Sequence, residues 1–479
     1  MDADSGKPLA AAFSPAAEMR IHSPHPGFAE QEPELWWQEL IRATDLLRKK
    51  FPFGTNEIIA IGISYQMHGL VCIDKNGQPL RPAIIWCDSR AVDFGSDAFN
   101  KLGHAFCLDH FLNSPGNFTA SKLKWVRENE PDTYAKIAKV LLPGDFIALK
   151  MTGEATTTIS GLSEGIFWDY KENGIAHSLL DFYQIDQSIL APSVPNFGDQ
   201  GRLQASAAEL LGIAPGTPIC YRAGDQPNNA FSLNVMEPGE IAATAGTSGV
   251  LYGITDQPVY DLRSRVNSFI HVNHRKEDPR YGILMCLNGT GILNSWLRRE
   301  FFADESYETM NAGASVIPIG AEGIICYPFG NGSERILENK NTGGQIKGLD
   351  FNRHNRYHLA RAAQEGIVFS MIYGAEIMQE MGLSLKRVRA GYSNMFLSDL
   401  FAQTFADCSQ CPVELYNTDG ALGAARGAGY GVNLYLQMKD CFVGMEIIRK
   451  VEPEKNNRSI VKELYEHWKE GLESLTRNT

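Results

Sequence analysis

The chain has 479 residues, 44% of them hydrophobic and 21% charged, and it carries a formal net charge of −12 at pH 7. A single hydrophobic core rarely serves so many residues, so two large domains are expected. The composition is that of a globular protein and excludes disordered and fibrous ones. The excess of acidic residues argues against a broad nucleic-acid-binding surface.

The cysteines and the hydropathy pattern bear on the compartment. Nine cysteines lie scattered without framework spacing, which predicts reduced thiols rather than disulfides. Cys408 and Cys411 form a single CxxC pair that lacks two further ligands, so no metal site is predicted. The sequence shows no signal peptide and no apolar run of membrane length. We therefore expect a soluble cytoplasmic protein with neither a membrane nor a nucleic-acid partner.

The first residues predict a turn at Asp4–Lys7 followed by a strand, as though the first half of a hairpin were missing. A helix is predicted from Pro33, because acidic residues surround this proline and suit the positive end of a helix. Its apolar residues recur at helical spacing and predict a face that packs on a sheet. They are Leu35, Trp36, Leu40, Ala43 and Leu47.

Two apolar segments of the first half end in polar residues. The segment 57–65 predicts a buried strand, with Gln66, Met67 and His68 at its carboxyl end, where α/β proteins place ligands. A histidine beside a methionine suits a small polyol, because the imidazole can bond a hydroxyl and the thioether can cover a carbon face. An ordinary loop histidine is the alternative. The segment 82–90 ends in Asp88 and Arg90, which either touch a ligand or pair with each other.

The stretch 221–255 is the most informative part of the chain. Asp225 stands at a predicted turn between Gly224 and Gln226, and the apolar segment 230–235 follows it. Two short apolar runs, 241–245 and 250–254, then predict a hairpin whose tip reads Gly-Thr-Ser-Gly.

The composition of this tip suits phosphate binding. Its backbone N–H groups can converge on an anion, and the hydroxyls of Thr247 and Ser248 add donors. A carboxylate about twenty residues upstream of such a tip suggests phosphoryl transfer, in which Asp225 takes the proton from an acceptor hydroxyl. The alternative is an ordinary hairpin turn and a turn-stabilising aspartate.

The second half also alternates strands and helices. Apolar residues at helical spacing predict one long helix over 354–381. A strand over 281–288 leads to Gly-Thr-Gly at 289–291, which opens a helix. A helix of almost only small residues begins after Asp419 and suits either an interdomain hinge or a tight packing face. The Thr/Ser/Gly-rich loop at 156–170 is interpreted as architecture rather than chemistry.

Taken in order, these pieces resemble the FGGY carbohydrate kinases, and among them the xylulokinase-like branch, over essentially the whole chain. The motifs are PGFAEQEPELWW (26–37), YQMHGLV (65–71), LRPAIIWCDSR (80–90), AGDQPNNAFSLNVMEPGE (223–240), TAGTSGV (244–250), FGNGSER (329–335) and DGALGAARGA (419–428). The resemblance implies an α/β fold of two actin-like/hexokinase-like (ribonuclease H-like) domains around a cleft. A sugar-binding domain with the catalytic base is expected at 1–240, and a nucleotide-binding domain at 241–479.

The resemblance also implies roles for single residues. Asp225 matches the catalytic base, and Met67 with His68 matches a ketopentose-contacting pair where glycerol kinases carry Arg-Glu, which favours a ketose over glycerol. The residues that the resemblance assigns to the sugar are Gln66, Met67, His68 and Gln226. Those it assigns to the nucleotide are Gly246, Thr247 and Ser248 of the second phosphate loop, and Gly391 and Asn394 of the adenosine loop.

Two departures from the family pattern stand out. Family members begin with a strand and an Asp-x-Gly-Thr turn, the first phosphate loop, and this sequence starts after it. The N-terminal strand of the first domain is therefore expected to be missing and activity to be impaired. A start assigned too late is the favoured explanation, since a buried central strand is not dispensable. In the adenosine loop, residues 392–394 read Tyr-Ser-Asn where much of the family has consecutive glycines.

The function that the resemblance implies is ATP- and Mg²⁺-dependent phosphorylation of a sugar hydroxyl, with a ketopentose such as D-xylulose as the leading substrate. The sugar and ATP are the expected small-molecule partners, and a homodimer is the assembly considered. Two alternatives stay open. One is a non-catalytic sugar-binding or regulatory relative that has lost the first phosphate loop. The other is a kinase for another ketose, such as L-ribulose or L-fuculose.

Overall fold

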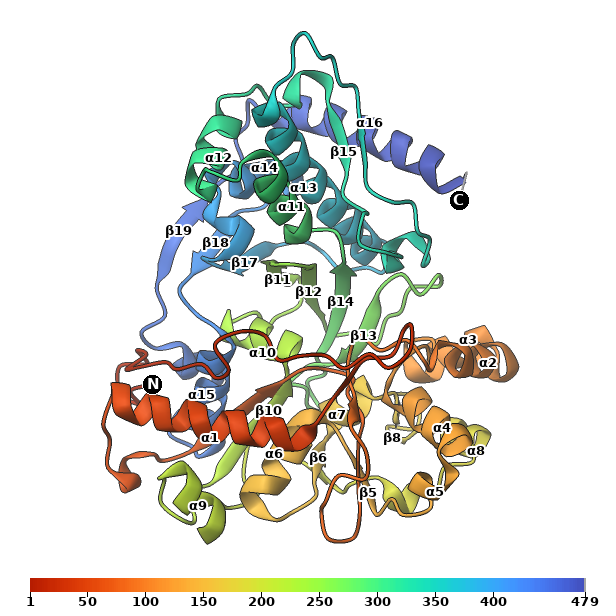
Figure 1. The fold of residues 1–479 in the computed structure, drawn as a ribbon, viewed down its shortest axis with the longest axis vertical. Helices are drawn as coiled ribbons and strands as arrows, with labels where there is room; N and C mark the ends of the chain where they lie inside the picture. Colours follow the sequence, from red (N-terminus) through yellow and green to blue (C-terminus); the bar gives the residue numbers. More distant parts are fainter. Residues whose placement is uncertain (478–479) are drawn as a thin grey trace. The chain divides into compact units, whose positions relative to one another are not determined.

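Residues 1–477, which the computed structural model describes, fall into two units, and the chain passes between them more than once (Figure 1). Unit 1 comprises Met1–Asn234, Phe269–Pro279 and Asp419–Met445. Unit 2 comprises Val235–Ser268, Arg280–Thr418 and the residues from Glu446 onward. Segments far apart in the sequence therefore complete unit 1.

Unit 1 mixes short strands with helices. Its strands are β1 (Glu30–Gln31), β2 (Ile61–Tyr65), β3 (Val71–Ile73), β4 (Ala83–Ile84), β5 (Lys139–Leu141), β6 (Thr157–Thr158), β7 (Trp168–Asp169), β8 (Gly174–Ile175), β9 (Ser193–Val194) and β10 (Ile219–Gly224). Its helices are α1 (Pro33–Lys50), α2 (Val92–Leu102), α3 (His104–Phe111), α4 (Thr119–Asn129), α5 (Pro131–Tyr134), α6 (Pro143–Thr152), α7 (Ile159–Glu164), α8 (His177–Tyr183), α9 (Ala205–Leu211), α10 (Asp225–Ser232) and α15 (Gly420–Gly431).

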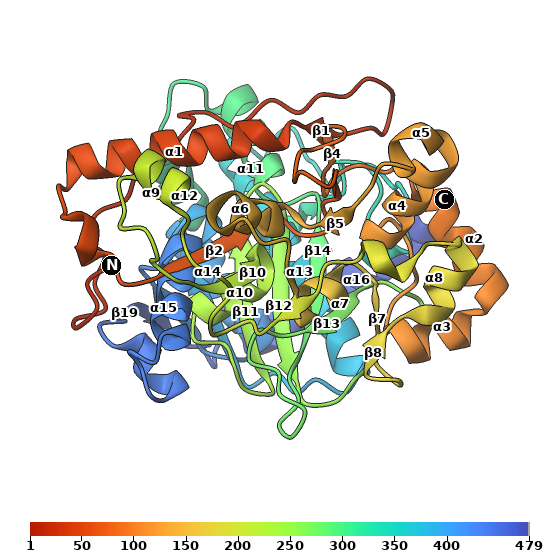
Figure 2. The ribbon, with the colours of Figure 1, turned by 90° about the horizontal axis from the view of Figure 1, so that it is seen from below.

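Strands β2 and β10 run parallel in the middle of unit 1 (Figure 2). Alternate side chains of a strand point to opposite faces. One face meets α6, where Asp145 pairs with Arg222 of β10 at 3.1 Å. The other face meets α15, and the approach is so close that a Cβ on Gly62 would lie 2.0 Å from the carbonyl oxygen of Ala424. The small residues of α15 thus serve tight packing within unit 1. This agrees with the second alternative given for this helix, a tight packing face.

The N-terminal segment departs from expectation in two places. The turn forms, with the Ser5 N–H bonded to Asp2 Oδ1 at 2.8 Å, but residues 8–12 form no strand. Within residues 1–477 the segment pairs with no other strand, and a strand needs such a partner for its backbone groups. In α1 the apolar face is also rotated from the predicted one: Trp37 is buried and Leu35 is 43% exposed.

Unit 2 is built on a seven-stranded mixed sheet with the order β13-β14-β12-β11-β17-β18-β19. Its strands are β11 (Glu240–Ala245), β12 (Gly249–Thr255), β13 (Asn267–Ile270, where the chain returns to unit 1), β14 (Tyr281–Leu287), β15 (Ile325–Tyr327), β16 (Gln345–Lys347), β17 (Arg387–Gly391), β18 (Val413–Tyr416) and β19 (Ile447–Val451). Its helices are α11 (Gly291–Phe301), α12 (Tyr307–Ser315), α13 (Arg356–Glu380), α14 (Asp399–Ser409) and α16 (Arg458–Arg477).

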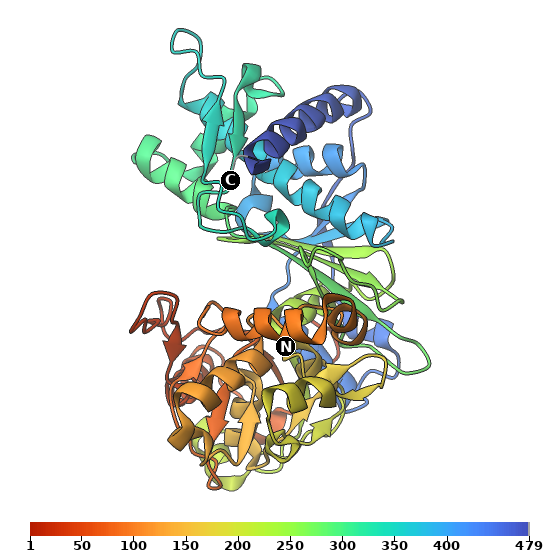
Figure 3. The same ribbon diagram turned by 90° about the vertical axis from the view of Figure 1, so that its right-hand side faces the viewer.

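The predicted elements of unit 2 are present. β11 and β12 form the expected hairpin, with Ala245 opposite Gly249 across the tip. The long helix predicted over 354–381 is α13, and it packs with α14 on the sheet, while α16 packs on these two helices (Figure 3). All nine cysteines are free thiols. None of the helices within residues 1–477 combines the length and the apolar character that a membrane span needs.

Candidate active site

Asp225 lies at the junction of a strand and a helix. β10 ends at Gly224, and Asp225 is the first residue of α10, a helix start rather than the predicted turn. An acidic residue suits this position, because the first turn of a helix carries a partial positive charge. The side chain reaches solvent, and Gln226 Nε2 donates to Asp225 Oδ2 at 3.1 Å.

The protonation of Asp225 is set by its surroundings. Burial among the neighbouring groups raises the pKa of Asp225 to about 6, although hydrogen bonds from Gln226 and from the Met67 backbone oppose the rise. A carboxylate with a pKa near 6 is still ionised at pH 7 and holds a proton more readily than an ordinary aspartate. Those are the properties that a general base for a hydroxyl needs.

Met67 and His68 lie beside Asp225 because β2 and β10 are parallel neighbours. Gly224 stands opposite Tyr65 in the register, so the residues after both strands meet at one edge. Met67 is buried, and a Cβ on Gly224 would lie 2.5 Å from its Cγ, so a larger residue before Asp225 would displace the Met67 side chain. The parallel pairing thus brings Met67 and His68, which the sequence predicts for the sugar, beside Asp225, which it predicts as the catalytic base.

His68 is held in a definite orientation. Its Nδ1 lies 3.0 Å from the main-chain oxygen of Glu164, and a ring nitrogen must carry a hydrogen to bond a carbonyl. The rings of Phe118 and Phe269 pack against the imidazole at centroid distances of 4.9 and 5.3 Å. The imidazole is therefore held in one orientation, and its contact with a ligand stays a prediction.

Gln66 completes the predicted group at the end of β2. Its Nε2 donates to Gln31 Oε1 at 3.3 Å. Its Oε1 is buried and accepts no hydrogen bond from the residues that the structure describes. A buried amide oxygen normally has a partner, so this atom is suited to accept a hydroxyl of a bound polyol.

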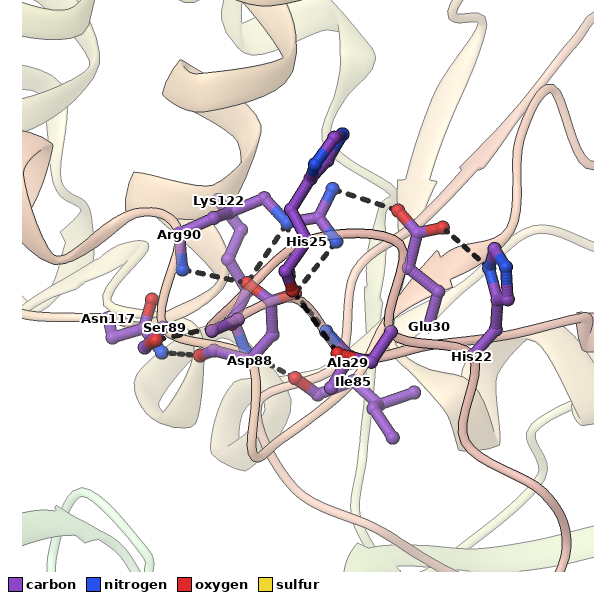
Figure 4. Close-up of polar contacts among 12 residues, drawn as sticks. His22, His25, Ala29, Glu30, Ile85, Asp88, Ser89, Arg90, Asn117 and Lys122 are labelled. Carbon is purple, nitrogen blue, oxygen red and sulfur yellow. Dashed lines mark hydrogen bonds and ion pairs between the residues drawn. The ribbon is translucent and has the colours of Figure 1, made fainter. Parts of the chain in front are cut away.

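Asp88 and Arg90 form a buried network instead of facing a ligand (Figure 4). Arg90 pairs with Asp88 at 2.7 Å and with Glu30 at 2.8 Å, and its guanidinium lies 3.7 Å from the centre of the Phe28 ring. Asp88 also accepts the Ala29 N–H at 2.6 Å. Of the two alternatives for this pair, the structure selects mutual pairing.

Lys122 links that network to the loop that follows β2. Its ammonium group is fully buried and donates to the main-chain oxygens of His68 and Ile85, each at 2.9 Å. Burial lowers the pKa of Lys122 to about 8, although the charge of Asp88 opposes this. The sequence analysis missed this residue, because a lysine inside an amphipathic helix gives no signal of burial.

Glu164 is a second residue that the sequence analysis missed. It lies in the loop region 156–170, interpreted as architecture, yet its Oε1 accepts the His68 N–H at 3.3 Å. Burial raises the pKa of Glu164 well above its usual range, and the charges of Asp145 and Asp225 act in the same direction.

In unit 2 the hairpin tip borders a cavity of about 340 Å³. Gly246, Thr247 and Asn394 line it, and Asn394 Nδ2 lies 3.7 Å from the position that a Cβ on Gly246 would take. Ser248 and Gly391 are not among the residues that line this cavity within the described part of the chain. Ser248 belongs to the tip, and Gly391 ends β17 two strands from β12.

Other polar residues of this cavity were not predicted. Asn294 is 7% exposed, and its Oδ1 has no hydrogen-bond partner within residues 1–477. Asn311 and Ser398 also line the cavity, and the buried Gln364 bonds both, at 2.9 and 2.8 Å. The cavity therefore offers fixed amide and hydroxyl groups, with one amide oxygen left for a ligand.

The tip rests on the turn that precedes α11. Gly291 N donates to Gly246 O at 2.8 Å, and Ile292 N donates to Thr247 O at 3.2 Å. Glu334 of the FGNGSER motif in turn accepts the N–H groups of Asn288 and Gly289 at 3.0 and 3.1 Å. Glu334 is fully buried, and burial raises its pKa to about 7. The Glu334 carboxyl therefore fixes the backbone of Asn288 and Gly289, which lies next to the residues that bond the hairpin tip.

No group of three or more His, Cys, Asp and Glu side chains is arranged to hold a metal ion in the part of the chain that the structure describes. Cys408 and Cys411 are separate free thiols. A metal ion that binds together with a phosphate-containing substrate takes some of its ligands from that substrate and needs fewer from the protein.

Comparison with known proteins gives a consistent result. Residues 11–232 match the family model of the N-terminal domain of the FGGY family of carbohydrate kinases, and residues 241–432 match its C-terminal domain. The chain is 30% identical over 472 residues to the xylulose kinase of Bacillus subtilis (strain 168), an alignment that covers 94% of this chain and 92% of that protein. It is 26% identical over 411 residues to the xylulose kinase of Escherichia coli (strain K12), covering 86% and 82%.

Solved structures agree on the fold. A structure described as a xyloylose kinase from Brucella ovis superposes with a TM-score of 0.88 at 24% identity, covering 99% of this chain and 96% of that one. A gluconate kinase from Lactobacillus acidophilus superposes with a TM-score of 0.86 at 22% identity, covering 96% and 92%. Since these two proteins are named for different substrates, the shared fold does not decide the sugar.

Proposed function

Because the chain belongs to the FGGY family of carbohydrate kinases, we propose that it transfers the γ-phosphoryl group of Mg-ATP to a hydroxyl of a ketopentose, with D-xylulose as the leading candidate. The chain has the α/β fold of this family and is a phosphotransferase. The finer proposal concerns the identity of the sugar, the residues that bind it, and which part of the chain binds the sugar and which part binds the nucleotide.

The observation that carries the proposal is the junction of β2 and β10. It sets Asp225 beside Met67 and His68, which matches the ketose pattern rather than the Arg-Glu pair of glycerol kinases. Gln66 adds a buried oxygen that is suited to a hydroxyl. A poor nucleophile such as a sugar hydroxyl needs a base within hydrogen-bond reach, and Asp225 supplies one whose pKa is about 6.

In the proposed mechanism each part of the chain has a separate task. Asp225 accepts the proton of the attacking hydroxyl, while His68 and Gln66 orient the sugar and Gln226 orients the base. Residues 1–240 thus bind the sugar, and residues 241–479 bind the nucleotide. Thr247 and Ser248 with the tip N–H groups hold the phosphates. A Mg²⁺ ion bound to ATP would neutralise part of the charge of these phosphates.

The nucleotide assignment is supported by the cavity beside the tip. The unpartnered Asn294 oxygen can accept a hydrogen bond from an amino or hydroxyl group, and nucleosides carry both. Asn394 borders the same cavity and is proposed to contact the nucleotide. Gly391 stays a prediction as a nucleotide-binding residue.

The test is coupled ADP release with Mg-ATP over a panel of ketoses, with D-xylulose, L-ribulose, gluconate and glycerol among the compounds. Turnover of a pentulose that exceeds turnover of glycerol and gluconate is the expected result. If no compound is turned over while calorimetry still detects sugar binding, the chain is a sugar-binding relative and the proposal is wrong. Sedimentation velocity would separately test the predicted homodimer.

A further inference from the structure

Glu164 is buried where three elements of unit 1 meet. It is the last residue of α7 and is 2% exposed. The loop after β2 lies on one side of its carboxyl, and the backbone at the end of β10 lies on the other. None of the roles proposed above uses this carboxyl.

Glu164 contacts His68 in two ways. Its main-chain oxygen meets Nδ1 at 3.0 Å, and its Oε1 accepts the backbone N–H at 3.3 Å. His68 has a φ of 60°, a left-handed backbone conformation that a histidine adopts only when its surroundings hold it there. Lys122 bonds the His68 carbonyl from another side at 2.9 Å. The direction of the imidazole therefore depends on these contacts.

The other carboxyl oxygen of Glu164 packs against the residue before the base. A Cβ on Gly224 would lie 2.6 Å from Glu164 Oε2 and 2.5 Å from Met67 Cγ. Both separations are shorter than a van der Waals contact, so the Met67 side chain and the Glu164 carboxyl lie close against Gly224. A displaced carboxyl would move the backbone that carries Asp225.

The surroundings of Glu164 affect the pKa of its carboxyl. Burial raises the pKa of Glu164 well above its usual range, the charges of Asp145 and Asp225 raise it further, and the hydrogen bond from His68 opposes them. Tyr65 and the Arg222–Asp145 ion pair are the other ionisable groups nearby. The carboxyl can accept the His68 N–H whether or not it carries a proton.

We propose that Glu164 is a positioning residue of the sugar site, which holds His68 in its strained conformation and sets the backbone in front of Asp225. The inference rests on the proposed function, because a fixed His68 matters only if it meets a sugar hydroxyl. A displacement of about 1 Å in a positioning group can lower turnover by about 10²-fold.

The test compares Glu164→Gln, which keeps the shape and an acceptor oxygen, with Glu164→Ala, which removes both. For Glu164→Gln at pH 7 we expect a kcat/KM for the sugar within about threefold of wild type, and for Glu164→Ala a loss of about 30-fold or more. The Kd for ATP, measured by calorimetry, is expected to be the same in all three proteins. Gly224→Ala places a methyl group against Glu164 Oε2 and should therefore lower kcat/KM for the sugar without changing the Kd for ATP.

Three results would overturn the inference. They are wild-type sugar kinetics in Glu164→Ala, an equal loss of sugar and ATP affinity in that variant, and a Glu164→Gln protein as impaired as Glu164→Ala. If Glu164→Ala does not fold, Glu164→Gln and Gly224→Ala decide by the same criteria. Failure of the proposed function is distinct from all of these, since the wild-type chain would then turn over no ketose.

Discussion

Replacement of Asp225 by Asn tests the proposed base most directly. Asparagine keeps the shape of the side chain beside Gln226 but cannot accept the proton of a hydroxyl. We expect kcat to fall by about 10²-fold or more, while sugar affinity is retained, because general base catalysis contributes about that much.

The pH dependence of the wild-type enzyme follows from the same residue. With a pKa of about 6, Asp225 is largely ionised at pH 7 and about one-tenth ionised at pH 5. Below pH 6, kcat/KM for the sugar should therefore fall by about tenfold per pH unit. An aspartate at its ordinary pKa would keep the rate unchanged across this range.

The raised pKa also predicts an effect on stability. The folded-state pKa of Asp225 lies above the unfolded value of 3.8, so the folded protein binds this proton more tightly. Its contribution to the free energy of unfolding therefore falls as the pH rises from about 4 through about 6. A shift of about two units corresponds to about 3 kcal/mol. Because solvent reaches the side chain, screening reduces the effect, and we expect about 1–2 kcal/mol.

Asp225→Asn should therefore be inactive and yet more stable than wild type at pH 7.5, with equal stability at pH 4. Coupled ADP release from pH 5 to 8 and urea unfolding at the two pH values measure both effects. Turnover within a few-fold of wild type would remove Asp225 from the role of base. A flat wild-type profile between pH 7 and 5 would show that the assigned pKa is wrong.

Three further substitutions probe the supporting residues. Lys122→Met removes a buried cation whose pKa in the folded protein, about 8, lies below its unfolded value. As the pH rises from 7 to above 10, the unfolding free energy of the wild type should therefore increase by about 3 kcal/mol relative to this variant. Equal pH dependence of the two proteins in urea unfolding would contradict the assigned pKa. Glu334→Ala leaves two backbone N–H groups unpaired, and we expect the KM for ATP to rise about tenfold with no change in sugar affinity, measured by steady-state kinetics and calorimetry. Asn294→Ala removes an oxygen, Oδ1, that makes no hydrogen bond within the described residues, so the melting temperature should stay unchanged. The affinity for ATP should weaken about fivefold, because the variant loses this acceptor. A large loss of stability would show a structural role instead.

Local pattern was enough for several elements of the fold. The long apolar stripe predicts α13, and the two short apolar runs with the tip between them predict the β11–β12 hairpin. Each of these depends on the spacing of neighbouring residues or on turn chemistry, which the sequence carries directly.

Where a partner decides the structure, local pattern was misleading. The strand predicted after the first turn does not form, because the backbone groups of residues 8–12 meet no paired strand within residues 1–477. The face of α1 is set by the core that covers it, so Trp37 is buried where the spacing favoured Leu35. A periodicity shows that a helix has an apolar face and leaves the rotation to the packing.

The sequence by itself determined the family, the position of the candidate base and the motifs around it, because these are written in short contiguous segments. The tertiary structure alone decided what surrounds them. It brings Glu164 to His68 across 96 positions of the chain and Glu334 to the turn before α11 across 46. Burial and neighbouring charge, which no linear pattern records, then set the pKa of Asp225, Lys122 and Glu334. Those shifts arise because desolvation acts on a group only once distant segments have closed around it.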